Sequence, residues 1–381
     1  RARIAFAMAR PSPAPASAPR ILIVRLSALG DVAMASPLIG ALRQAYPEAH
    51  LAWLAQPEVE PVLAHHGELD ELITLPRDRW QRLARRGQWA TLVRENLALL
   101  RHLRRQRFDW AIDPQGLLKS GLLARLTGAP RRIGVDSREG SALLMSEVVQ
   151  TGEDRSRISS EHLALARHLG LPVEDGFPMH VALGQAEARW ADEALRRAAV
   201  PGDYVALMPF TTRPQKHWFE DRWRLLAQRL SDRGRATVIL GGPSDRQAAE
   251  RIAHGAQRPN VHPWAGRTTL GQAIALVDRA AGAVGVDTGL THIALARQRP
   301  TVCLFGATLP YADVGAHPGR VIYHKQPCSP CQRRPICGGA HHCMQEIEVG
   351  EVIGALEALM DQPAGAPRQK QLAGAETEGE L

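Results

Sequence analysis

Asp287, Thr288 and Gly289 stand between a short apolar stretch, residues 283–286, and a predicted helix at residues 290–297. A strand that turns directly into a helix leaves several backbone N–H groups free at one point, where the positive end of the helix dipole also lies. Such a turn favours phosphate binding, and here a Thr288 hydroxyl and a Gly289 backbone open to close approach would help it. An ordinary strand-to-helix turn is the alternative interpretation, because many α/β domains carry glycine there.

Two further polar turns contain residues suited to a nucleotide. The first reads TTRPQK, and its Thr211 and Thr212 hydroxyls could donate hydrogen bonds to phosphate oxygens. Lys216, at the end of the same turn, would supply a positive charge to a leaving diphosphate. The second turn, GGPSD, ends in Asp245, near the place where a ribose could bind.

Asp31 follows the first predicted strand, residues 21–26, and stands at the start of a helix. A carboxylate held at this place could accept a proton from an incoming hydroxyl group. Capping of the helix is the alternative interpretation, because Asp is a favoured N-cap residue. Open α/β sheets bind their ligands at the carboxyl ends of the strands, so Asp31 and the polar turns are predicted to meet in one region.

Apolar strands alternate with amphipathic helices along most of the chain. Strands are predicted at residues 21–26, 50–55, 71–75, 109–113, 131–135, 204–210, 236–241, 283–286 and 301–305, and helices near 58–65 and at 185–199, 219–232, 244–254, 270–281 and 290–297. This alternation predicts an α/β fold with two doubly wound, Rossmann-like units facing each other across a cleft. Neither half has a G-x-G-x-x-G sequence after its first strand, which argues against a dinucleotide-binding oxidoreductase.

The predicted organisation has five parts. They are a disordered leader at residues 1–20, an N-terminal Rossmann-like domain at 21–184, a linker at 185–202, a C-terminal Rossmann-like domain at 203–360 and a disordered tail at 361–381. A hydrophobic content of 45% and a charged content of 23% are typical of a soluble globular protein. Because no secretory signal is evident, we expect a cytoplasmic protein whose five cysteines are reduced.

Positive charge is concentrated in one segment. Ten arginines lie between Arg77 and Arg107 against Asp78 and Glu95, in a chain whose formal net charge is +8. The segment could face nucleic acid, anionic lipid headgroups or a phosphorylated substrate, or it could be a solvated helix face. Aromatic residues make up only 5% of the chain, which leaves few platforms for base stacking and makes nucleic acid the weaker option.

Four motifs together resemble one known family. ILIVRLSALGD, IDPQGLLKSG, FTTRPQKHW and VGVDTGLTH, in this order, are similar to the ADP-heptose:lipopolysaccharide heptosyltransferases of glycosyltransferase family 9, which have the GT-B fold. The resemblance runs from about Ile21 to Leu359. It implies transfer of heptose, with inversion, from ADP-heptose to the Kdo (3-deoxy-octulosonate) region of the lipid A inner core.

The resemblance also implies roles for individual residues. Asp31 is expected to be the general base, and the acceptor is expected to contact Ser27, Gly30, Arg77, Arg79, Gln115, Lys119 and Arg138. The donor is expected to contact Thr211, Thr212, Lys216, Asp245, Asp287, Thr288, Gly289, Leu290 and His292. The expected partners are ADP-heptose, a Kdo-lipid A or inner-core lipopolysaccharide acceptor and the anionic inner membrane surface, with no nucleic acid and no cofactor. The N-terminal domain would then bind the acceptor and the C-terminal domain the donor.

No Asp-x-Asp sequence is present, so the divalent-metal clamp of many sugar transferases is not expected. A loop rich in Pro and Gly carries Cys328, Cys331, Cys337 and Cys343 in the pattern C-x2-C-x5-C-x5-C. A structural zinc site, four ordinary thiols and an oxidised pair all stay open for this cluster. No cysteine lies in the polar turns, so we expect its role to be structural.

Two other questions stay open. The TTR-x-x-KHW segment resembles heptosyltransferase I more than heptosyltransferase II, whereas the cysteine-rich loop is more similar to the second type. At the position where heptosyltransferase I often has an acidic residue for the adenosine ribose, this sequence has Arg246, and Asp245 stands beside it. A catalytically inactive GT-B module that binds a nucleotide sugar or glycolipid, and a basic, zinc-stabilised nucleic-acid binder, are alternatives of other classes.

Overall fold

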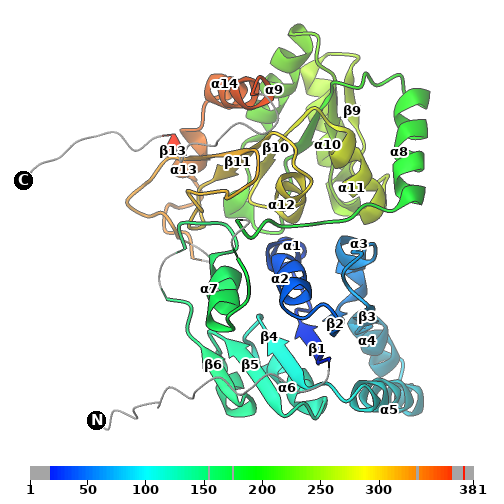
Figure 1. Cartoon of the computed structure of the whole chain (residues 1–381). Helices are drawn as coiled ribbons and strands as arrows, with labels where there is room; N and C mark the ends of the chain where they lie inside the picture. The colour runs from blue at the N-terminus through cyan, green and yellow to red at the C-terminus, as the bar shows by residue number, and fades with distance from the viewer. Residues whose placement is uncertain (1–17, 153–154, 174–175, 332–333, 363–371, 374–381) are drawn as a thin grey trace, which may run out of the picture.

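Two parallel β-sheets, each with helices on both faces, lie one above the other in a computed structural model of the chain (Figure 1). The structure describes residues 18–152, 155–173, 176–331, 334–362 and 372–373. The N-terminal half of the chain forms the lower sheet of Figure 1, and the C-terminal half forms the upper sheet. The predicted α/β fold with two doubly wound units is therefore confirmed.

The first sheet has the strand order β3-β2-β1-β4-β5-β6. Its strands are β1 (Arg20–Val24), β2 (His50–Ala55), β3 (Glu71–Thr74), β4 (Trp110–Asp113), β5 (Arg131–Val135) and β6 (Glu147–Val149). Four consecutive residues of β1, Ile21–Val24, are buried, as expected for a parallel strand covered on both faces.

Two separate apolar layers hold helices on this sheet. One face packs against α1 (Leu29–Ala35), α2 (Pro37–Ala45), α3 (Glu60–Leu63) and α7 (Ser160–His168). The other face packs against α4 (Arg77–Arg85), α5 (Trp89–Arg105) and α6 (Leu118–Leu126). Short 3-10 turns lie at η1 (Pro57–Val59) and η2 (Ser141–Leu144).

The second sheet has the order β13-β12-β11-β10-β7-β8-β9. Its strands are β7 (Val205–Met208), β8 (Thr237–Ile239), β9 (Val261–Pro263), β10 (Gly282–Val286), β11 (Thr301–Phe305), β12 (Gly319–Tyr323) and β13 (Leu372–Ala373). One face carries α9 (Glu220–Asp232), α10 (Arg246–Ala256) and α14 (Val349–Met360), and the other carries α8 (Gln185–Arg197), α11 (Leu270–Arg279) and α12 (Gly289–Ala296). The shorter elements are η3 (Pro214–Lys216), η4 (Pro243–Asp245) and α13 (His342–Gln345).

The two halves touch where α1 meets α12. A Cβ atom on Gly30 would lie 2.5 Å from Cδ2 of His292, and one on Gly289 would lie 2.6 Å from the Leu29 side chain. Real Cβ atoms do not approach other atoms so closely, so this contact requires glycine on both helices. The contact brings the N-terminal ends of both helices to the same region.

Helix α8, which was predicted to bridge the two units, packs against α11 beside the second sheet. The domain boundaries themselves stay a prediction. The predicted leader and tail lie outside the described residues, apart from residues 18–20, 361–362 and the two residues of β13. None of the helices in the described ranges is long and apolar enough to cross a membrane.

Candidate active site

A cleft of about 1630 Å³ opens between the two sheets. It is lined by residues that follow β1, β7, β8, β10 and β11, so it lies at the carboxyl ends of the parallel strands. Pockets for a single small ligand usually measure about 300–1,000 Å³. The cleft therefore has room for a nucleotide sugar and part of a second substrate.

All of the residues predicted to contact the donor line this cleft. They are Thr211, Thr212, Lys216, Asp245, Asp287, Thr288, Gly289, Leu290 and His292. Asp245 also accepts a hydrogen bond from the Gly242 backbone N–H at 2.8 Å and so holds its own turn. The Thr288 side chain makes no capping bond to α12, which leaves its hydroxyl free for a ligand at the helix N-terminus.

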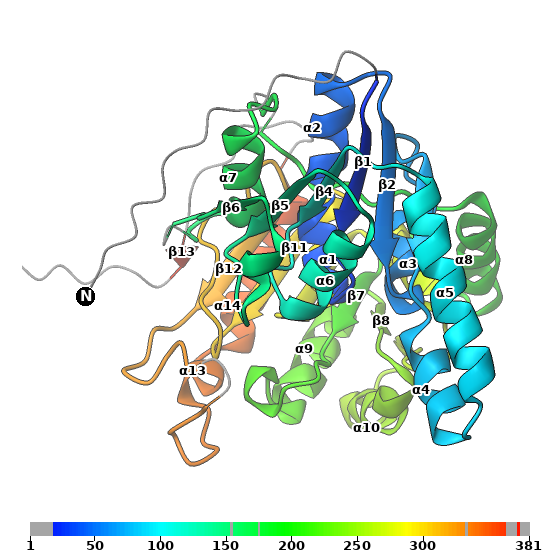
Figure 2. The same ribbon diagram turned by 90° about the horizontal axis from the view of Figure 1, so that it is seen from below.

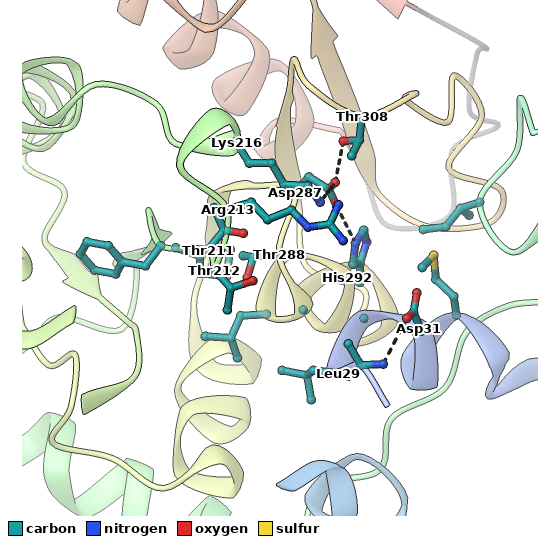
Figure 3. A pocket seen from close by; sticks show the side chains of 18 of the residues that line it. Leu29, Asp31, Thr211, Thr212, Arg213, Lys216, Asp287, Thr288, His292 and Thr308 are labelled. Atoms are coloured by element: carbon teal, nitrogen blue, oxygen red, sulfur yellow. Dashed lines mark hydrogen bonds and ion pairs between the residues drawn. The ribbon is translucent and has the colours of Figure 1, made fainter. Parts of the chain in front are cut away.

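Asp287 joins three other side chains of the second half (Figure 3). One carboxylate oxygen accepts from the Lys216 ammonium and, at 2.6 Å, from the Thr308 hydroxyl. The other lies 3.3 Å from Nε2 of His292, whose Nδ1 lies 3.1 Å from the Tyr311 hydroxyl. The five side chains thus form one connected polar network behind the phosphate-binding turn.

Asp287 stays ionised in this network. Burial raises the pKa of its carboxyl, but the hydrogen bond with His292 and the charges of His292 and Lys216 outweigh burial and hold the pKa well below its usual range. The carboxylate therefore fixes the Lys216 ammonium, which has three N–H donors and can direct the others into the cleft.

Asp31 lies in the first turn of α1 and lines the same cleft, below His292 in Figure 3. Its Oδ2 accepts from the Ala28 backbone N–H at 3.1 Å and lies 2.9 Å from the Arg25 guanidinium. The N-cap residue of α1 is therefore Ala28 and not Asp31, which lies at the third helical position and bonds back to the N-cap backbone. Because the side chain is still 42% exposed, the carboxylate can also be reached by a substrate hydroxyl.

The turn after β4 positions Arg25. Asp113, the last residue of β4, is buried, and its carboxylate accepts hydrogen bonds from the backbone N–H groups of Gln115 at 3.0 Å and Gly116 at 3.1 Å. The Pro114 carbonyl in this turn accepts from Arg25 at 2.9 Å. Arg25 in turn pairs with Asp31, so the turn acts on the candidate base through one arginine.

The residues predicted to contact the acceptor are not all brought together. Gly30 and Arg138 line the cleft, whereas Ser27, Arg77, Arg79, Gln115 and Lys119 do not. The Gln115 side chain instead accepts from the Leu26 backbone N–H at 2.9 Å. The Arg79 guanidinium forms a bidentate ion pair with Glu95, at distances from 2.8 to 3.1 Å.

Among the cleft residues that were not predicted from the sequence are Arg25, His162, Thr308 and Tyr311. Arg25 and Thr308 follow strands β1 and β11, and that position could have indicated them. His162 gave no such signal. Both of its ring nitrogens are buried without a hydrogen-bond partner in the described structure, and burial, with the Arg25 charge, lowers its pKa to about 3.

The four clustered cysteines are free thiols, as is Cys303. Within the described ranges, no three His, Cys, Asp or Glu side chains gather closely enough to hold a metal ion. None of the cysteines lines the cleft.

Comparisons with known proteins agree with this geometry. A family model described as glycosyltransferase family 9 (heptosyltransferase) matches residues 96–337. Lipopolysaccharide heptosyltransferase 1 of Pseudomonas aeruginosa is 31% identical over 327 residues, which cover 83% of this chain and 86% of the relative. Lipopolysaccharide heptosyltransferase 2 of Escherichia coli K12 is 26% identical over 357 residues, which cover 90% of this chain and 98% of the relative.

Solved structures show the same fold. A family 9 glycosyltransferase from Veillonella parvula superposes with a TM-score of 0.79 at 20% identity, covering 92% of this chain and 99% of the other. The E. coli heptosyltransferase WaaC with ADP-2-deoxy-2-fluoro heptose superposes with a TM-score of 0.65 at 25% identity, covering 89% and 99%.

Proposed function

The chain belongs to glycosyltransferase family 9, and from this premise we propose that it transfers heptose from ADP-heptose to the Kdo region of the lipopolysaccharide inner core, with inversion. One observation carries the proposal. One side of the cleft, formed by the turns after β7 and β10, carries the Lys216 ammonium and several hydrogen-bond donors. The same cleft contains an accessible carboxylate, Asp31.

In the proposed reaction, an acceptor hydroxyl attacks the anomeric carbon of the heptose while Asp31 takes its proton. The bond between that carbon and the diphosphate breaks, and ADP leaves with the bonding electrons. Lys216, the hydroxyls of Thr211 and Thr212 and the N-terminus of α12 stabilise the charge that develops on the diphosphate. A single displacement of this kind inverts the anomeric configuration.

The proposed reaction uses no divalent metal. The absence of an Asp-x-Asp sequence supports this part of the proposal. The Lys216 ammonium, held by Asp287, is a fixed positive charge in the cleft and would take the place of a metal clamp.

The proposed acceptor is Kdo-lipid A rather than an already heptosylated core. The 31% identity to the P. aeruginosa heptosyltransferase 1 supports this choice. A heptosylated core is the second candidate, favoured by the cysteine-rich loop at residues 328–343. We place the enzyme in the cytoplasm, peripherally associated with the inner membrane through its arginine-rich segment.

Product analysis tests the proposal. After incubation with ADP-heptose and Kdo-lipid A, mass spectrometry should show the acceptor heavier by one heptose. NMR of the new glycosidic bond should show the anomeric configuration opposite to that of the donor. A retained configuration would contradict the single displacement, and modification of heptosylated core alone would favour the second candidate.

A further inference from the structure

Large apolar side chains gather on one outer surface of the first half. In the described part of the chain, eight such side chains are exposed, and six of them lie on α5, α6 and η2. They are Trp89 (60% exposed), Val93 (55%), Leu97 (48%), Leu118 (48%), Leu122 (48%) and Leu143 (91%). We call these six residues the apolar face.

The six side chains belong to one layer of the structure. A spacing of four residues places Trp89, Val93 and Leu97 along one stripe of α5, and Leu118 and Leu122 along one stripe of α6. Both helices cover the same face of the first sheet, the near face in Figure 2, and they touch where Arg104 Nε donates to the Leu126 carbonyl at 3.3 Å. Since α6 also packs against η2, Leu143 extends the same surface.

Unneutralised positive charge lies beside the apolar face, on α4 and α5. The segment from residue 77 to residue 107, which forms α4 and α5, carries ten arginines and two carboxylates, so its net charge of +8 equals that of the whole chain. All ten arginines are exposed. Across the described residues, only Arg79 among the ten forms an ion pair, with Glu95. The surface therefore lacks the carboxylates that would be needed to balance its charge.

The apolar face begins where the wall of the cleft ends. Leu117, Arg138 and Glu139 line the cleft. Leu118, which follows Leu117 in the sequence, belongs to the apolar face, and its backbone N–H donates to the Glu139 carboxylate at 3.3 Å. A lipid bilayer in contact with α6 would thus lie next to the opening of the cleft.

We propose that the apolar face inserts into an anionic lipid bilayer, with the arginines of α4 and α5 on the lipid phosphates. Apolar side chains flanked by arginines are typical of surfaces that lie in the membrane interface. A second copy of this chain is unsuited to cover the apolar face, because two arginine-rich segments, each with a net charge of +8, would face and repel each other. In this orientation the cleft opens at the headgroup level, so a lipid-anchored acceptor reaches Asp31 without leaving the bilayer; this last point rests on the proposed function.

Sedimentation with vesicles tests the insertion without any reaction. Wild-type protein should bind vesicles of phosphatidylcholine with phosphatidylglycerol, and it should bind vesicles of phosphatidylcholine alone far less. The variant Trp89→Ser/Leu118→Gln/Leu122→Gln should bind the anionic vesicles about tenfold more weakly or worse. Ile336→Gln is the matched control, because Ile336 is 81% exposed but lies on the cysteine-rich loop, and it should bind like wild type.

The triple variant replaces exposed side chains, so its melting temperature should match that of wild type and its turnover of a deacylated, water-soluble acceptor should be unchanged. Its turnover of acceptor embedded in vesicles should fall in proportion to vesicle binding. Binding that salt abolishes but the triple variant leaves intact would show that the arginines act alone, and would overturn insertion. If wild type binds vesicles as expected but modifies neither acceptor, the proposed function fails while the membrane surface stands.

Discussion

At the scale of single residues, Asp31 has to combine two roles that the sequence presented as alternatives. Its carboxylate caps the start of α1 through Ala28 and pairs with Arg25, yet its side chain is 42% exposed to the cleft. These two contacts fix the direction in which the carboxylate points. A fixed carboxylate needs little reorganisation before it takes a proton.

Asp31→Asn should therefore abolish turnover while ADP-heptose still binds. Removal of a general base typically costs about 100- to 10,000-fold in rate. The matched control is Asp78→Asn, since Asp78 also lies in the first turn of a helix, α4, but outside the cleft. Steady-state rates and donor titration by calorimetry would decide. A near-wild-type rate for Asp31→Asn would remove this residue from the mechanism.

Lys216 gives the second prediction at this scale. Lys216→Ala should weaken donor binding and slow the reaction, because the ammonium beside Asp287 is a fixed cation facing the proposed diphosphate site. Lys325→Ala, at a lysine outside the cleft, should leave both quantities unchanged. EDTA should not reduce the wild-type rate. A strict requirement for Mg²⁺ would show that a metal, and not Lys216, neutralises the leaving group.

Every residue predicted to contact the sugar donor lines the cleft, whereas only part of the set predicted for the acceptor does. Asp287 and Thr288 come directly after β10, and Lys216 lies in the turn that follows β7. The carboxyl ends of parallel strands share one edge of the sheet. Gln115 also follows a strand, but its side chain turns back to the Leu26 backbone. Sequence position identifies the edge of the sheet, but it does not show which polar side chains hold the protein together and which face the substrate.

At the scale of elements, most of the parallel strands followed from the sequence, but β6, β9 and the five-residue β12 did not. The buried runs that form β2 (His50–Ala55), β5 (Arg131–Val135) and β11 (Thr301–Phe305) were predicted with the bounds that the structure has. β6 and β9 have three residues each, and so short a stretch carries no measurable period. Their place is set by pairing with a neighbouring strand, which is a tertiary contact.

The turn after β4 should make stability depend on pH. Burial raises the pKa of Asp113 from 3.8 to about 6, despite the hydrogen bonds that it accepts. Because this pKa is raised on folding, protonation favours the folded state, and stability falls as the pH rises through about 6. Between about pH 5 and pH 7.5, urea unfolding of wild type should lose about 1 kcal/mol relative to Asp113→Asn. If the difference in unfolding free energy between wild type and Asp113→Asn stayed constant across this range, the raised pKa of Asp113 would be contradicted.

The cysteine-rich loop gives a prediction about donor binding. Burial raises the pKa of Cys343, and the charges of Cys331, Cys328 and Cys337 add to this rise, so the four thiols lie near one another. None of them lines the cleft, so we expect Cys328→Ser/Cys331→Ser to keep the donor affinity of wild type, whether or not the loop holds zinc. Metal analysis together with calorimetry would check this. Bound zinc with a lower melting temperature for the double variant would establish a structural site.

At the scale of the whole molecule, the two halves are joined at a contact that no periodicity could reveal. Gly30 of α1 and Gly289 of α12 let the two helix N-termini approach each other across the cleft. The alternation of strands and helices predicted two units, but the sequence does not show which helix of one unit meets which helix of the other. That contact brings Asp31 into the same cleft as Lys216, Asp287 and Thr288.

The central claim is that this arrangement transfers heptose rather than only binding it. ADP release, followed with purified protein, ADP-heptose and Kdo-lipid A, tests the claim most directly. We predict ADP release only when donor and acceptor are both present, and none from Asp31→Asn under the same conditions. ADP release without acceptor would indicate hydrolysis, and no release from the complete mixture would indicate a binding module; either result would contradict heptosyl transfer.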